Sequence, residues 1–412
     1  MNIYFIIIIF SLTGACLLGI ISRQLNRGAL SLELPEEFKT TFDPEKYRKS
    51  QDYAKAGIGF ENVTSSFMTT VTLLFIVWGG FNALDIWAAG FGYGEVVTGL
   101  IFFAGLAILS DILSMPFSVY QTFVIEEKFG FNKTNLKTFI VDKIKGYLLG
   151  GIIGGILLSG ILIFFSAAGQ LAWLWCWIFI VVVTLAIQYL APTLILPLFN
   201  KFTPLEEGEL KDKIQNFATT NGFEISGIFM IDGSKRSTKA NAYFTGFGKK
   251  KRIALFDTLI NELSTDEIVA VLAHEIGHSK LGHVRKMMIM SMINTGLIFL
   301  LMSFFLGNKE LFAAFGMQHI SIHAGLIFFA LLYTPVSIVL SIFSSARSRK
   351  HEFEADNFAA ATTKNPYALI GALKTLSVSN LSNLTPHPFY VWLEYSHPPV
   401  LKRIENLKSQ KI

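Results

Sequence analysis

The sequence predicts a predominantly α-helical protein that crosses a membrane several times and carries polar segments with a small β-sheet. Of its 412 residues, 52% are hydrophobic and only 16% are charged, whereas about a quarter are charged in a typical soluble domain. The apolar residues gather in long uncharged blocks instead of being spread evenly. This distribution favours a membrane protein with a polar portion over one large globular core.

Seven segments are long and apolar enough to cross a bilayer, which takes about 20 residues in a helix. They cover residues 3–21, 64–84, 97–118, 147–167, 171–195, 287–306 and 322–343. The first segment has neither a basic leading stretch nor a small-x-small cleavage site, which argues against a signal peptide. We therefore predict seven transmembrane helices.

These spans divide the chain into four parts. Residues 1–195 hold five spans, 196–286 form a polar module, 287–343 hold two spans, and 344–412 form a polar C-terminal part. With the amino terminus outside, the inside segments contain 34 of the 35 Lys and Arg residues. Cytoplasmic loops are enriched in these residues. We expect both polar parts to face the cytosol, at the endoplasmic reticulum in a eukaryote or at the inner membrane in a bacterium.

The polar module is expected to contain two helices and a small sheet. Thr203-Pro204-Leu205-Glu206 has a capping-box pattern with proline at the first helical position, which predicts a helix start. Three β-prone runs follow, at 228–231, 241–247 and 252–256. A second capping box begins at Ser264 and opens a helix whose apolar residues recur at helical spacing.

This second helix carries a metal-binding pattern. His274 and His278 lie four residues apart, so both imidazoles leave one helical face and can bind one ion. Zinc lowers the pKa of water at such a site towards roughly 7, and the adjacent Glu275 can accept the proton. The alternative is a chance HExxH, but the capped amphipathic helix supplies the context that the motif needs. We predict one Zn²⁺ per chain, with Glu275 as the general base.

A catalytic zinc site uses three protein ligands and one open position. His283 follows His278 by five residues, which turns it away from the ligand face and predicts an ordinary helix-surface residue. In the last polar part, Glu352 and Asp356 lie four residues apart on one face of a predicted helix, whereas Glu354 points the other way. We predict Glu352 as the third ligand and Asp356 as the hydrogen-bond acceptor that orients a ligand histidine. A solvated charged turn is the alternative for this stretch.

Six motifs resemble, in the same order, those of the CAAX prenyl protease family of the first type. They are EEKFGFN (126–132), PLFNKFTPLEEGEL (197–210), NAYFTGFG (241–248), HEIGH (274–278), EFEAD (352–356) and SHPPVLKRI (396–404). These proteins are membrane zinc metallopeptidases of the a-factor-converting kind, and the resemblance covers nearly the whole chain. It implies that Glu352 is the third zinc ligand. It also implies a barrel of seven helices around a water-filled chamber, closed by a cytosolic zincin-like metalloprotease domain.

The resemblance further implies the substrate and the strand that binds it. Family members cut prenylated C-a-a-X peptides and release the last three residues. Asn241, Ala242 and Tyr243 would lie on an edge strand that pairs with extended substrate. From the sequence alone, the same run is equally an ordinary strand.

Two further residues match the family's HPPxxxR element. His397 would stabilise the oxyanion of the tetrahedral intermediate, and Arg403 would pair with a carboxylate near the metal, such as Asp356. Without the resemblance, Ser396-His397-Pro398-Pro399 is simply a helix start.

The expected partners are a lipid bilayer and a peptide or protein substrate, prenylated or bare, and we expect a monomer with no nucleic-acid partner. One alternative is a membrane quality-control metalloprotease without a prenyl requirement, although such proteins usually have about four spans. Another is a non-proteolytic membrane protein with structural zinc. A structural site needs four protein ligands, and the sequence offers three convincing candidates.

Overall fold

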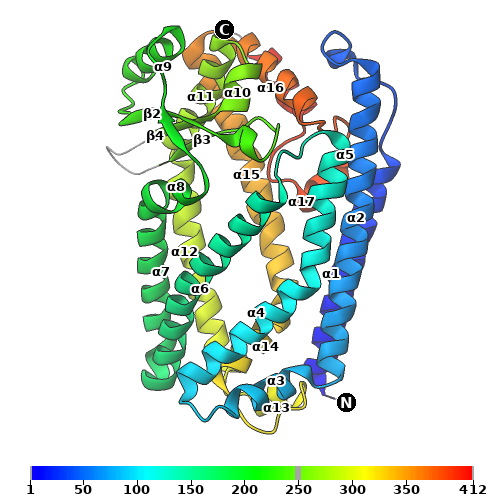
Figure 1. Ribbon diagram of the computed structural model, residues 1–412, viewed down its shortest axis with the longest axis vertical. Coiled ribbons are helices and arrows are strands. Elements are labelled where there is room, and N and C mark those ends of the chain that lie inside the picture. Colours follow the sequence, from blue (N-terminus) through cyan, green and yellow to red (C-terminus); the bar gives the residue numbers. More distant parts are fainter. Residues whose placement is uncertain (1, 246–251, 411–412) are drawn as a thin grey trace.

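The long helices run along one axis of the protein, and the polar domain sits at one end of them (Figure 1). A computed structural model describes residues 2–245 and 252–410, with only the backbone of residues 243–245. The amino terminus lies at the end far from the polar domain, and the carboxyl terminus lies within that domain. The polar domain therefore combines residues 202–280 with the carboxyl-terminal residues, which are distant in sequence.

Six helical segments are long and apolar enough to span a membrane, and a bent pair of helices makes a seventh. The helices are α1 (Ile3–Gly28), α2 (Pro44–Val77), α4 (Glu95–Tyr120), α6 (Leu136–Ala167), α7 (Ala172–Leu190) and α12 (His283–Phe305). The bent pair is α14 (Ile322–Leu332) and α15 (Thr334–Thr363), which meet at 58°. Each of the seven predicted spans overlaps one of these helices, although the second, 64–84, runs past the end of α2 at Val77. The predicted multi-pass α-helical architecture is confirmed.

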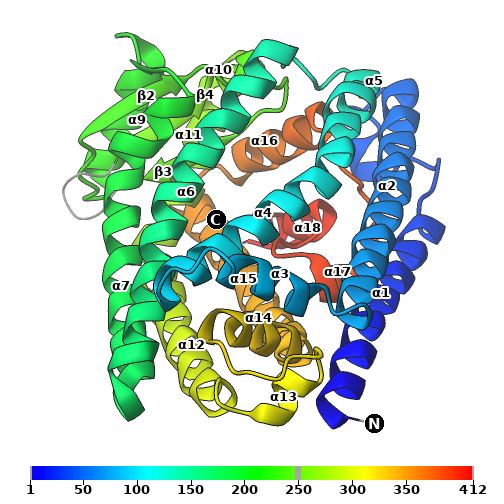
Figure 2. The ribbon, with the colours of Figure 1, turned by 60° about the horizontal axis from the view of Figure 1, so that its bottom comes forward.

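The long helices are arranged in a ring around the middle of the molecule (Figure 2). A helix packed in a solid bundle buries a stripe at least about 100° wide, more than a quarter of its circumference. In the six spans, the share of buried residues in the apolar window is much smaller. It ranges from 0% in Gly169–Phe199 to 17% in Glu95–Phe129. Inward-facing side chains are therefore left largely uncovered, which is the packing expected around a chamber.

The end of the ring away from the polar domain is closed by short helices (Figure 1). These are α3 (Gly80–Ala89) and α13 (Lys309–Ala313), which pack with α14 around a buried aromatic cluster that includes Phe81, Phe312 and Phe328. Asp85 on α3 is buried and bonds to His323 Nε2 at 2.5 Å and to His319 Nε2 at 2.6 Å. These contacts tie α3 to the start of α14.

The polar domain contains a four-stranded sheet in the order β1-β2-β4-β3. Its strands are β1 (Phe202–Pro204), β2 (Gly227–Ile231), β3 (Ala242–Thr245) and β4 (Arg252–Phe256). The β2–β4 pair is parallel, and both outer pairs are antiparallel. The three predicted strands are all present, and residues 246–247 of the second predicted run lie outside the described residues.

The helix predicted to begin at Thr203 is wrong. Residues 202–204 form β1, in which Thr203 pairs with Met230, and the helix α9 (Glu209–Thr220) starts only after Gly208. Proline is tolerated on an edge strand because one side of such a strand needs no donor. Pairing with β2 therefore overrides the local capping pattern around Pro204.

The remaining helices form the cap of the polar domain. They are α10 (Asp257–Glu262), α11 (Thr265–Lys280), α16 (Pro366–Ser379), α17 (Pro388–Glu394) and α18 (Val400–Ser409), while α5 (Glu127–Phe129) and α8 (Leu196–Phe199) extend α4 and α7. The predicted capping box opens α11, because Ser264 Oγ accepts from the Glu267 amide and the Glu267 carboxylate accepts from the Ser264 amide. One face of α11 packs on the sheet, and another packs on α15 and α16.

The approach of α11 to α15 depends on small residues. Ala270, Ala273, Ala359 and Ala360 are buried between the cap helices. A Cβ added to Gly277 would lie 3.3 Å from the Ala355 Cα and 3.1 Å from Phe358 Cδ1. The close approach brings the side chains of α15 within reach of the two histidines on α11.

Candidate metal centre

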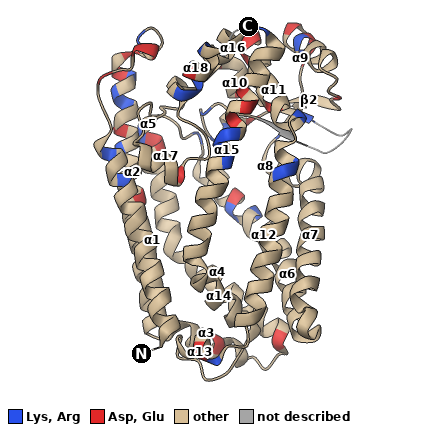
Figure 3. Cartoon of the chain, turned by 180° about the vertical axis from the view of Figure 1, so that it is seen from behind, with Lys and Arg blue, Asp and Glu red and all other residues tan. Residues whose placement is uncertain are grey.

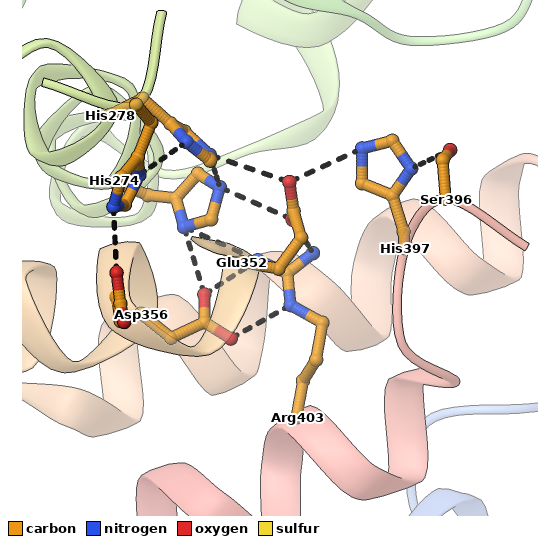
Figure 4. Close-up of polar contacts among 9 residues, drawn as sticks. His274, His278, Glu352, Asp356, Ser396, His397 and Arg403 are labelled. Atoms are coloured by element: carbon orange, nitrogen blue, oxygen red, sulfur yellow. Dashed lines mark hydrogen bonds and ion pairs between the residues drawn. The ribbon is translucent and has the colours of Figure 1, made fainter. Parts of the chain in front are cut away.

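Three side chains from α11 and α15 converge on one point (Figure 4). His274 Nε2 lies 3.1 Å from His278 Nε2 and 3.5 Å from Glu352 Oε2. His278 Nε2 lies 3.4 Å from Glu352 Oε1. Ligands bound tetrahedrally to zinc at about 2.0–2.1 Å would stand roughly 3.3 Å apart. The spacing of these donors therefore suits a single tetrahedral ion.

Burial of these donors also fits a cation. His274 and Glu352 are only 6% and 5% exposed. Glu352 Oε2 is buried and makes no hydrogen bond among the described residues, with Arg403 Nη1 3.4 Å away, and a buried carboxylate oxygen without a hydrogen bond is costly. Among those residues, the group able to bind one ion at this point has three members, His274, His278 and Glu352. Three ligands leave a fourth position open.

Asp356 and Arg403 contact this group on the side that faces away from the converging point. Asp356 Oδ1 lies 2.8 Å from His274 Nδ1, the nitrogen that faces away from the converging point. Arg403 holds the same carboxylate with two donors, Nε to Oδ2 at 2.8 Å and Nη2 to Oδ1 at 2.6 Å. Burial lowers the pKa of His274, but the carboxylates of Asp356 and Glu352 raise it to about 9. A proton therefore competes with a cation for His274.

His397 lies beside the metal group on an exposed segment. Its Nε2 is 3.4 Å from Glu352 Oε1, and its side chain is 65% exposed. Ser396 Oγ contacts the other ring nitrogen at 2.9 Å. Arg349 donates to the carbonyls of Val391 and Tyr395, which fixes the end of α17 just before this segment. An accessible imidazole thus lies beside one of the donors of the metal group.

Glu275 follows His274 on α11 and is half-buried. The negative charge of Glu275 acts on Arg403. Burial lowers the pKa of the Arg403 guanidinium, but Asp356, Glu352 and Glu275 together raise this pKa above its ordinary value. Because Glu275 directly follows His274, its backbone lies beside the metal group.

The predicted substrate-binding run lies at the edge of the sheet. Ala242 and Tyr243 belong to β3, which pairs with β4 on one side and with no other described strand. The Asn241 carbonyl accepts from the Phe256 amide at 3.1 Å. The side chain of Tyr243 lies outside the described residues. β3 adjoins α11, the helix that carries His274 and His278.

Comparison with known proteins assigns the family. Residues 25–201 match the family described as "CAAX prenyl protease N-terminal, five membrane helices", and residues 204–411 match "Peptidase family M48". The CAAX prenyl protease 1 homolog of Oryza sativa subsp. japonica is 37% identical, over 91% of this chain and 90% of that protein. The chain belongs to the CAAX prenyl protease 1 family. CAAX prenyl protease 1 of Saccharomyces cerevisiae is also 37% identical, over 91% and 88% of the two chains. The Homo sapiens homolog is 34% identical, over 94% and 91%.

The fold of this CAAX prenyl protease 1 family member is that of a solved relative. The crystal structure of S. mikatae Ste24p matches with a TM-score of 0.94 and 34% identity, over 99% of both chains. The chambered helical architecture that the sequence resemblance implied is thereby confirmed. Membership of peptidase family M48 makes the chain a multi-pass membrane metallopeptidase that uses a catalytic metal.

One residue at the metal centre was missed from the sequence. His283 is not a surface residue: it is 1% exposed, and its Nδ1 lies 3.1 Å from His278 Nδ1. The prediction assumed that α11 continues, but α11 ends at Lys280 and Gly282 takes a φ of +71° before α12 begins. Gly282 itself was the available signal, because glycine commonly ends a helix in this left-handed conformation.

Proposed function

We propose that this family member is a zinc endopeptidase that removes the C-terminal tripeptide from prenylated C-a-a-X substrates. His274, His278 and Glu352 would hold the zinc. The observation that carries the proposal is the convergence of these three donors, 3.1–3.5 Å apart, with a fourth position open. The prenylated substrate follows from the relatives, which are CAAX prenyl proteases.

The reaction divides among the chain's own residues. A bound zinc ion supplies Lewis-acid polarisation and lowers the pKa of water to about 7. Glu275 takes the proton of the attacking water and later delivers it to the leaving amine. His397 donates to the oxyanion of the tetrahedral intermediate. Asp356 holds His274 in the tautomer that directs Nε2 to the metal.

Substrate would be held as an added strand. The edge of β3 that pairs with no described strand, along Asn241, Ala242 and Tyr243, would add an extended peptide as a further strand. Main-chain pairing places the scissile bond without demanding particular side chains. Such a mode suits substrates that differ in sequence near the cleavage site.

We propose that the catalytic domain faces the cytosol. Charged residues gather at the end of the molecule that holds α11 and α18, and the long helices are mostly uncharged (Figure 3). The Lys and Arg residues at that end match the enrichment found in cytoplasmic loops. A prenylated C-a-a-X peptide, whose prenyl chain favours the membrane, would approach from the same side.

Cleavage of matched peptides tests the proposal. Purified protein would be incubated with one peptide in prenylated and bare forms, and the products identified by mass spectrometry. We expect loss of the last three residues from the prenylated form, abolished by chelation and restored by zinc. Glu275→Gln should retain one zinc per chain and lose about 10²–10⁴-fold in rate, the usual contribution of a general base.

Other outcomes favour other functions. Equal cleavage of prenylated and bare peptides would favour a quality-control protease without a prenyl requirement. Stoichiometric zinc with no chelator-sensitive cleavage of either peptide would favour a structural metal. Wild-type turnover by the Glu275→Gln variant would remove Glu275 from the mechanism.

A further inference from the structure

Each of the two ligand imidazoles has a partner on the nitrogen that faces away from the metal position. For His274 this partner is Asp356. For His278 it is His283, whose Nδ1 lies 3.1 Å from His278 Nδ1. Because His278 Nε2 lies with the converging donors, Nε2 must keep its lone pair, and the proton of the neutral ring sits on Nδ1. His278 therefore donates, and His283 Nδ1 accepts.

This assignment decides the state of His283. With a lone pair on Nδ1, its neutral ring carries the proton on Nε2, which lies 2.9 Å from Glu354 Oε2. A carboxylate can only accept when ionised, so the second hydrogen bond runs in the matching direction. One arrangement of protons satisfies the chain of contacts from His278 through His283 to Glu354.

The surroundings of His283 keep its ring in place. The side chain is 1% exposed and stacks on His351 with the ring centroids 4.1 Å apart and the planes at 7°. Gly282, with a φ of +71°, sets the turn that returns the first residue of α12 to the metal centre. We propose that His283, held by Glu354, is a positioning residue that fixes the tautomer and ring orientation of His278. This inference rests on the proposed zinc site and deepens it.

The same side chains suggest a competing use as a second cation site. Ligand atoms of His283, His351 and Glu354 lie within 4.8 Å of one another, and His351 Nδ1 is buried without a hydrogen-bond partner among the described residues. A cavity of about 640 Å³ reaches His351 and Glu354. Proximity alone thus permits either use.

Two features favour positioning over a second cation. Parallel stacked rings direct their nitrogens side by side, not towards one ion, and both nitrogens of His283 already have partners. The cavity is also lined by three cationic side chains, Lys286, Arg347 and Lys350. Their charge opposes the entry of a metal ion.

Two substitutions of His283 separate hydrogen bonding from packing. His283→Phe keeps a flat ring on His351 but removes the acceptor. His283→Asn loses ring volume but keeps an acceptor oxygen near the position of Nδ1. Zinc affinity would be measured on the purified full chain by competition with a chelator. We expect His283→Phe to bind zinc about 10- to 100-fold more weakly, the usual effect of losing a ligand's hydrogen-bond partner, and His283→Asn to retain most of the affinity.

His351→Phe is the matched control, because it preserves the stack and touches no ligand. We expect its zinc affinity to equal that of the wild type. Equal affinity of wild type and His283→Phe, or equal weakening in the Phe and Asn variants, would overturn the positioning role. Two zinc ions per wild-type chain, with one lost in His351→Phe, would overturn it in favour of a second cation site. Failure of the proposed zinc site looks different, since the wild type itself would bind no zinc, and failure of the proposed protease activity would leave these zinc affinities unchanged.

Discussion

At the scale of single residues, Arg403 connects the two carboxylates that α15 presents to the metal centre. It grips both oxygens of Asp356 and lies 3.4 Å from Glu352 Oε2 through Nη1. Asp356 is fully buried. Without the guanidinium, two negative groups would face each other in a water-poor site. Arg403 therefore stabilises the folded protein as well as the geometry of the ligands.

Substitution of Arg403 tests this role. Removing one member of a buried ion pair typically costs 3–5 kcal/mol, so Arg403→Ala should lower the free energy of unfolding by about that amount. Arg403→Lys keeps the charge but cannot span both Asp356 oxygens, so we expect a smaller loss. Denaturant unfolding in detergent measures both. Lys402→Ala is the control on the same helix: its exposed pair with Glu405 should contribute at most about 1 kcal/mol.

The raised pKa of His274 predicts how metal affinity depends on pH. Since neighbouring carboxylates raise the pKa of His274 to about 9, this imidazole is protonated at neutral pH and must release a proton when a metal binds. The apparent association constant should rise about tenfold per pH unit below 9 and level off above it. Chelator competition at several pH values, corrected for the chelator's own protonation, measures the slope. A flat profile between about pH 6 and 8 would contradict the proton competition.

At the scale of secondary-structure elements, the spacing between α11 and α15 decides whether the donors meet. Gly277 lies between His274 and His278 on α11. The Cβ of a residue other than glycine would lie 3.3 Å from the Ala355 Cα. In an isolated helix, Gly→Ala stabilises by up to about 1 kcal/mol, whereas overpacking a core costs about 1–3 kcal/mol. Packing should prevail over propensity here.

We therefore expect Gly277→Ala to destabilise the protein by up to about 2 kcal/mol, which is the balance of those two effects. It should also weaken zinc binding, because α11 shifts away from Glu352. Ser264→Ala provides a comparison on the same helix. It removes the capping box at a cost of about 0.5–2 kcal/mol without moving the ligand face. A Gly277→Ala variant that loses stability but binds zinc as the wild type does would show that the helix spacing is not critical.

Elements defined by their own periodicity could be predicted from the sequence. The apolar spans, the capped helix α11 and the pairing of Glu352 with Asp356 on one face all depend on residues within a few positions of each other. Strand β1 could not be predicted, because the capping pattern around Thr203 is overridden by β2, which lies more than twenty residues later in the chain. The place of His283 depends on the turn at Gly282, and each residue by which a helix is lengthened or shortened turns the next side chain by about 100°.

At the scale of the whole molecule, the ring of helices is closed at both ends. The short helices α3 and α13 with α14 close one end, held partly by the bonds of Asp85, and the catalytic domain caps the other. The hollow ring explains why span helices carry so few buried residues. The metal ligands His274 and Glu352 are themselves almost inaccessible, with 6% and 5% exposure. A folded substrate cannot press a peptide bond against such a site.

The enclosed site predicts that cleavage depends on the length of unfolded chain before the scissile bond. A stable folded domain would be joined to the best peptide substrate through linkers of about 5 or 15 residues, which span at most roughly 18 and 54 Å when extended. We expect the short linker to lower kcat/KM by at least tenfold, because a small domain, about 30 Å across, collides with the helices before the peptide can pair with β3. The long linker should restore cleavage, and a destabilised, unfolded version of the domain should be cut at either length. Cleavage that is independent of linker length would show that the bond is reached from an open surface, contrary to the closed architecture.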